Sequence, residues 1–85
     1  MSYIYDGFPT WEAAENFAAV AANQYDLPAI VFADQASANR HCPFPYVLTA
    51  PIVHVDRPVY GDEDEEIENL LEREAVAHGG EYAGT

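Results

Sequence analysis

The chain has 85 residues, of which 15 are Asp or Glu and three are Arg, so its net charge at pH 7 is −12. That length holds one small domain and no second core, and a hydrophobic fraction of 49% is ordinary for a folded protein. The negative electrostatic potential of such a chain opposes binding to nucleic acid or to an anionic membrane surface and favours basic partners. We therefore expect one folded domain, residues 1–85, that binds a basic protein.

The few remaining bulk features indicate a cytoplasmic protein. The single cysteine, Cys42, cannot form an intramolecular disulfide. The first residues lack the basic segment and apolar run of a signal peptide. No apolar stretch approaches the roughly 18 residues that a membrane-spanning helix needs.

The chain opens with a predicted strand. Residues 2–5 are strand-forming, and strand alternation places Tyr3 and Tyr5 on one face and Ile4 on the other. The Asp-Gly pair that follows is a turn signal.

A first helix is predicted over residues 11–24. Thr10 is a good N-cap, and Pro28 lies just beyond the expected end of the helix. One helical face is apolar and mostly alanine, which allows close approach to a sheet. Its members are Ala14, Phe17, Ala18, Ala21 and Tyr25.

The middle of the chain predicts a second strand and a short helical turn. Residues 29–33 form an uninterrupted apolar run, which indicates a central strand buried on both faces. Asp34 is a suitable cap for one helical turn that reaches Arg40. Residues 42–45 contain two prolines and should be extended, and residues 46–50 fit either a strand or a turn.

A third strand is predicted over residues 52–56. Its alternation places Val53 and Val55 inward and His54 outward, and a proline near each end suits either an edge strand or the ends of a strand.

The last helix is predicted from Asp62 to His78. It buries Ile67, Leu70 and Leu71 at helical spacing, and the Gly-Gly pair after it is a stop signal. Residues 80–85 are then either a frayed tail or a short last strand.

This order of elements predicts an α+β fold, in which a three- or four-stranded sheet carries two helices on one face. A right-handed crossover places the first two strands parallel, and a last strand near Tyr82 would give a ferredoxin-like arrangement. The predicted core consists of Phe17, Ile30, Phe32, Val53, Val55, Ile67, Leu70 and Leu71.

The sequence offers no motif for catalysis, a cofactor or a metal. His41, Cys42 and His54 are the nearest set of metal ligands, but a zinc site needs three or four ligands at tighter spacing. Adjacent side chains on an extended segment point apart, so His41 and Cys42 do not form a nucleophile pair. There is no Gly-rich phosphate loop and no nucleophile elbow. We expect a binding protein rather than an enzyme.

The acidic run at the start of the last helix is the strongest functional signal. Six of the eight residues 61–68 are carboxylates, and capping a helix explains one or two of them. Residues 62–74 carry eight acids and one Arg, a net charge of −7, over about 20 Å of helix. That is one charge per roughly 3 Å of helix axis, which is within about twofold of the charge spacing along duplex DNA. The plain alternative is a solvated helix face.

We predict that this run binds the partner, with the tyrosine directly before it as an exposed aromatic anchor. The predicted partner-binding residues are Tyr60, Asp62, Glu63, Asp64, Glu65, Glu66, Glu68 and Glu72.

By its size, its charge, the run Asp62–Glu68 and its lack of catalytic motifs, the chain resembles the small phage-encoded anti-CRISPR and DNA-mimic proteins. The resemblance implies a stoichiometric inhibitor in the host cytoplasm, monomeric or weakly dimeric. Such an inhibitor occupies the DNA-binding surface of a nuclease or of a CRISPR surveillance complex. The class shares no sequence pattern, so it assigns no residue roles.

Two alternatives come from other classes. One is an acidic antitoxin that neutralises a basic protein, although antitoxins usually add a DNA-binding segment. The other is a housekeeping domain from a high-salt organism, in which salt screens the self-repulsion of an acidic surface.

Overall fold

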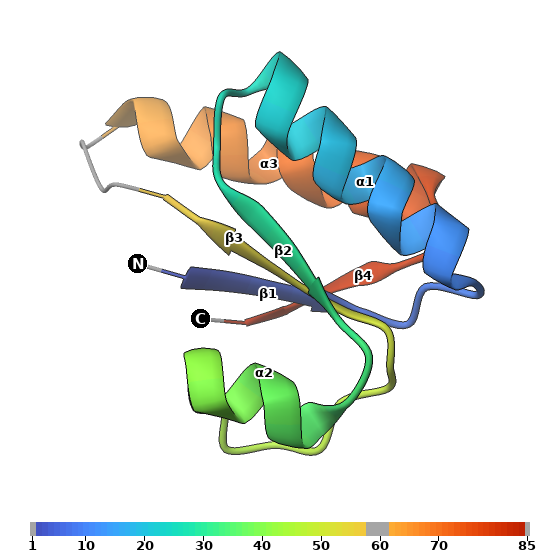
Figure 1. Ribbon diagram of the computed structural model, residues 1–85. Helices are drawn as coiled ribbons and strands as arrows, with labels where there is room; N and C mark the ends of the chain where they lie inside the picture. The colour runs from blue at the N-terminus through green and yellow to red at the C-terminus, as the bar shows by residue number, and fades with distance from the viewer. Residues whose placement is uncertain (1, 58–61, 85) are drawn as a thin grey trace.

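The computed structural model describes residues 2–57 and 62–84, with side chains for all of these except 62–64. Strands and helices alternate along the chain (Figure 1). The strands are β1 (Ser2–Asp6), β2 (Ala29–Phe32), β3 (Ile52–Asp56) and β4 (Glu81–Gly84). The helices are α1 (Trp11–Gln24), α2 (Gln35–His41) and α3 (Asp62–Ala77). The predicted α+β class is confirmed.

The four strands form one antiparallel sheet in the order β2-β3-β1-β4. β1 and β2 run in the same direction, as the crossover rule predicted, but β3 lies between them and pairs with both. Helices α1 and α3 cover one face of the sheet (Figure 1). This is the ferredoxin-like arrangement that the sequence suggested, with α2 added on the opposite face.

The sequence misplaced one strand within the sheet. The strand predicted as central, β2, lies at an edge, and Ile30, predicted in the core, is 41% exposed. An apolar run indicates that both faces of a strand are covered by other elements, but it does not indicate where the strand lies in the sheet. Here α1 covers one face of β2 and α2 approaches the other. Of the two alternatives that the prolines left open for β3, an edge position or the ends of a strand, the second holds. β3 is interior, and Pro51 precedes its first paired residue.

The larger core lies between the sheet and helices α1 and α3. Phe17 of α1 is its centre: its ring lies 4.8 Å from the Tyr5 ring and 5.4 Å from the Phe8 ring, measured between centroids. Phe17, Val53, Val55 and Leu71 are buried as predicted, and Ile67 packs against them partly buried. The prediction for Leu70 is wrong. Adjacent helical residues point about 100° apart, so Leu71 faces the core and Leu70 faces solvent.

A second, smaller core lies on the other face of the sheet. Ile4 and Ile52 project from the strands and meet Ala38 of α2 and Phe44 of the loop that follows it, with the predicted core residue Phe32 packed at the margin. Asp34 caps α2 as expected, because its Oδ1 accepts a hydrogen bond from Ser37 N–H at 2.7 Å. α2 is longer than the single turn predicted. The molecule therefore has three layers: helices, sheet, and α2 with its loop.

The helix ends follow the predicted capping residues. Thr10 Oγ1 accepts a hydrogen bond from Ala13 N–H at 3.0 Å and begins α1. At the end of α3, Gly79 has a φ of +86°, and Gly80 N–H donates to the carbonyl oxygen of Ala75 at 2.8 Å. That pattern is a Schellman motif, which reverses the chain. The following residues pair with β1 as β4, so this segment is a strand and not a frayed tail.

Candidate acidic interface on helix α3

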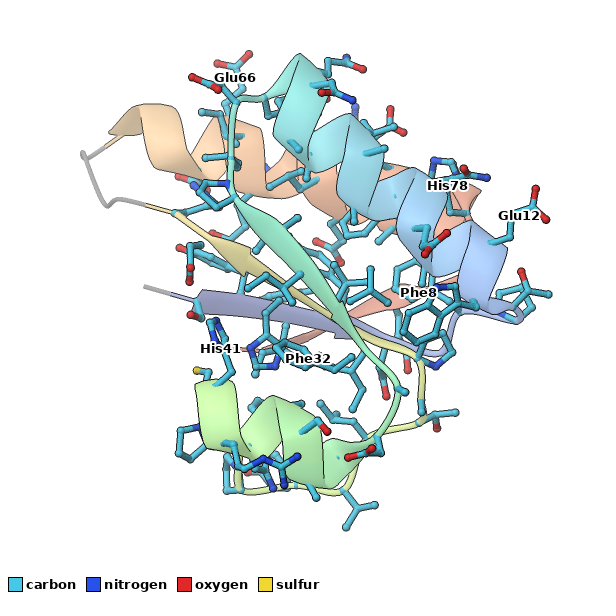
Figure 2. The ribbon with its side chains drawn as sticks, viewed as in Figure 1. Phe8, Glu12, Phe32, His41, Glu66 and His78 are labelled. Atoms are coloured by element: carbon cyan, nitrogen blue, oxygen red, sulfur yellow. The ribbon has the colours of Figure 1, made fainter. Side chains whose placement is uncertain are left out.

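Three of the predicted carboxylates lie along one flank of α3. Glu65, Glu68 and Glu72 are separated by three and then four residues, which places them on the same side of the helix. Glu65 and Glu72 are exposed and Glu68 is half-buried, whereas Leu71 faces the core. We call Glu65, Glu68 and Glu72 the acidic stripe. Glu66 is also exposed and points away from the sheet (Figure 2).

The remaining predicted site residues fall at the limit of the described chain. Asp62, Glu63 and Asp64 belong to the first turn of α3, but their side chains lie outside the described residues. Tyr60, the predicted aromatic anchor, lies outside the described residues as well.

Tyr82, on the edge strand β4, lies beside the acidic stripe. Burial raises the pKa of the Tyr82 phenol above its usual value, and the charges of Glu68 and Glu72 raise it further. Its ring lies 5.5 Å from the Tyr5 ring and 6.0 Å from the Tyr3 ring. The stripe therefore borders a tyrosine cluster. The sequence did not assign Tyr82 to this surface, because only the pairing of β4 with β1 brings it under α3.

One of the three arginines is turned into this tyrosine cluster. Arg57 is 2% exposed, and its guanidinium carbon lies 4.4 Å from the centre of the Tyr3 ring, a cation–π distance. Its positive charge favours ionisation of both Tyr5 and Tyr82, against the larger effect of burial. Since this cation is buried, it adds no accessible positive charge beside the stripe.

The solvent side of α3 continues the surface past the stripe. Asn69, Glu72, Arg73 and Val76 border a shallow depression there. Val76 is 61% exposed, so a carboxylate and an apolar side chain lie close together on an open helix face. Such a mixed depression suits an amphipathic side chain whose stem is apolar and whose end is charged.

The fold also brings together two of the residues considered as metal ligands. The His41 and His54 rings lie 5.5 Å apart, and the Phe32 ring contacts both. The labels for His41 and Phe32 mark this contact between α2 and the sheet in Figure 2. Over residues 2–57 and 65–84, no group of three or more His, Cys, Asp or Glu is placed to hold a metal ion.

No protein-family model, curated protein or solved structure matches this chain. In the part of the chain that the structure describes, no helix has the length and apolar character needed to cross a bilayer.

Proposed function

We propose that this protein is a stoichiometric inhibitor that binds the basic nucleic-acid-binding surface of a host defence complex of the CRISPR type and blocks its access to DNA. The observation that carries the proposal is the acidic stripe, which presents carboxylates along one flank of a single helix. A surface lined with Lys and Arg for a phosphate backbone is the complement of such a row.

The negative charge per unit length of α3 supports this choice of partner. The segment 62–74 carries a net charge of −7 and is helical throughout, so the spacing of about 3 Å per charge follows from helix geometry. Duplex DNA has one charge per about 1.7 Å. Opposite potentials of this strength speed association and make it salt-dependent.

Charge alone gives little affinity, because an exposed ion pair contributes roughly 0–1 kcal/mol. Two features near the stripe can add apolar contact. Tyr82 borders Glu68 and Glu72, and the depression beside Val76 can receive the stem of a partner's Lys or Arg. The partner surface should therefore combine basic groups with at least one apolar contact.

The proposal is tested by removing the charge of the stripe without changing its shape. The variant Glu65→Gln, Glu68→Gln, Glu72→Gln has three fewer negative charges and should keep the helix, because Gln and Glu have similar helix propensity. The control variant Glu12→Gln, Glu15→Gln, Asp26→Asn makes the same change in net charge at exposed positions of α1 and the residues after it. Circular dichroism checks that both fold.

Parent and variants are immobilised and used to capture proteins from a lysate of a bacterium that carries a CRISPR system. The captured complex is then tested for DNA binding in a mobility-shift assay with each variant added. We expect the parent and the control to release DNA at a one-to-one ratio, and the stripe variant to need at least about tenfold more protein. A parent that captures no nucleic-acid-binding protein, or a stripe variant that inhibits as well as the parent, contradicts the proposal.

A further inference from the structure

The loop after α2, residues 42–51, presents two large apolar side chains to solvent. Val47 is 92% exposed and Tyr46 is 69% exposed, although neighbouring Phe44 is buried in the smaller core. The Tyr46 ring contacts the Phe44 ring edge-on, with 5.5 Å between the centroids, whereas Val47 buries almost none of its surface. Exposed apolar groups that lie together mark contact surfaces.

Buried and half-buried side chains hold the backbone of this loop in place. Gln35 Oε1 accepts a hydrogen bond from Leu48 N–H at 2.7 Å, and Asp6 Oδ2 accepts one from Thr49 N–H at 2.9 Å. On the other side of the tip, Asn39 Oδ1 accepts from the N–H of Phe44 at 3.2 Å. The loop is therefore fixed on both sides of Tyr46 and Val47. A fixed contact loses little conformational entropy when it binds.

The charge around the loop restricts what can bind there. Residues 41–55 contain no Asp, Glu, Lys or Arg, the longest such run in the chain. The loop also follows α2, on the face of the sheet opposite α3 and its acidic stripe (Figure 1). A basic partner finds no complementary charge on this loop. Two copies of a chain of net charge −12 can meet here without opposing carboxylate rows.

Helix α2 supplies one exposed charge of each sign beside the loop. Asp34 precedes α2 and Arg40 lies in its last turn, and both are exposed. Their Cα atoms are separated by about 10 Å of helix. Within the chain the Arg40 guanidinium folds back to donate to Ser37 Oγ at 2.9 Å, and its charge acts on Asp34. When the two-fold axis crosses α2 at a right angle, the two α2 helices run antiparallel, and Arg40 of each copy then faces Asp34 of the other. The surface is thus self-complementary, as a two-fold interface requires.

We propose that α2 and the tip of its loop bind a second copy of this chain, with Tyr46 and Val47 at the two-fold axis. A contact of this extent belongs to the weak, transient class. It leaves both acidic stripes free, so it does not depend on the function proposed for α3. Salt should strengthen it by screening the net charge, whereas salt should weaken any binding of a basic partner to α3.

Sedimentation equilibrium of the purified chain, from about 0.02 to about 1 mM protein, measures this association over the range of weak complexes. The average mass of the parent should rise from monomer toward dimer and no further. Val47→Asp buries an unpaired carboxylate at the axis and should weaken dimerisation at least about tenfold. Arg40→Gln should weaken it about two- to fivefold through the two lost ion pairs.

Val76→Asp is the matched control, because Val76 is exposed on α3 and the substitution adds the same charge on the opposite face. It should change the dissociation constant by less than about twofold. A parent that stays monomeric to about 1 mM overturns the proposal. So does equal weakening by Val47→Asp and Val76→Asp, which would indicate general charge repulsion, and so does growth beyond a dimer.

Discussion

His54 is the side chain whose environment departs furthest from the expectation of strand alternation. It was predicted to face solvent, yet it is 1% exposed, because α2 and its loop cover that face of β3. Neither of its ring nitrogens has a hydrogen-bond partner. Its surroundings contain one other imidazole, His41 of α2, and one carboxylate, Asp56 of β3; its cross-strand neighbours Ile4 and Ile30 are apolar.

This burial makes the stability of the fold sensitive to acid. Burial lowers the pKa of His54, and His41 lowers it further, against a smaller opposite effect of Asp56. The unfolded chain therefore takes up the proton first, below about pH 6.5. Stability is fully present above that pH and falls with acid until the lowered folded pKa is reached, by at most about 1.4 kcal/mol per pH unit.

Urea unfolding of the parent and of His54→Leu, at several pH values between 7.5 and 5, measures this loss as a difference between the two proteins. The subtraction removes the effect of the many carboxylates, whose protonation relieves repulsion in both. We expect the parent to lose more stability than the variant as the pH falls. Parallel pH curves for the two proteins would show that His54 does not titrate differently in the folded state.

At the level of elements, the chain reversal that ends α3 contributes to the stability of the fold. Gly79 has a φ of +86°, and a Cβ placed there would lie 2.8 Å from Cδ of Pro9. Gly79→Ala therefore combines a left-handed backbone cost of roughly 1–2 kcal/mol with a steric clash. We expect the free energy of unfolding to fall by at least about 1 kcal/mol, measured by urea denaturation.

Ala77→Gly is the matched comparison for Gly79→Ala, because it changes an exposed residue in the last turn of the same helix and requires no unusual dihedral. It should cost about 1 kcal/mol or less. If Gly79→Ala is no more destabilising than Ala77→Gly, the reversal of the chain after α3 does not depend on this glycine.

The helices were predictable because their signals are local. Thr10, Asp34 and the pair Gly79-Gly80 each act within a few residues, and helical spacing alone places Glu65, Glu68 and Glu72 on one flank. Positions in the sheet depend on distant segments. Nothing within residues 52–56 indicates that β1 and β2 lie on either side of them. The contribution of Tyr82 to the acidic surface was missed for the same reason.

For the whole molecule, the net charge is large relative to its size. The chain measures 32 × 24 × 17 Å, and the screening length is about 30 Å at 0.01 M salt and about 3 Å at 1 M. At low salt, carboxylates therefore repel one another across the entire molecule. Salt should raise the thermal midpoint, by about 4–8 °C for each kcal/mol of repulsion that it relieves.

Far-UV circular dichroism at about 0.01 M and about 1 M NaCl tests this expectation and the alternative of adaptation to high salt. The two buried cores should keep the chain folded at both concentrations. A chain that folds only at about 1 M salt would favour a housekeeping protein of a salt-adapted cell over an inhibitor.

The strand order also determines when each strand can find its pairing partner during synthesis. β1 is made before the other three strands of the sheet, yet its partners come much later: Ile4 pairs with His54 and with Gly84. At about 5–20 residues per second, the ribosome needs about 4–16 s to make the chain between Ile4 and Gly84. Throughout that interval β1 has at least one unpaired edge. The nascent chain is thus exposed to wrong strand pairing for seconds, long after α1 has had time to form.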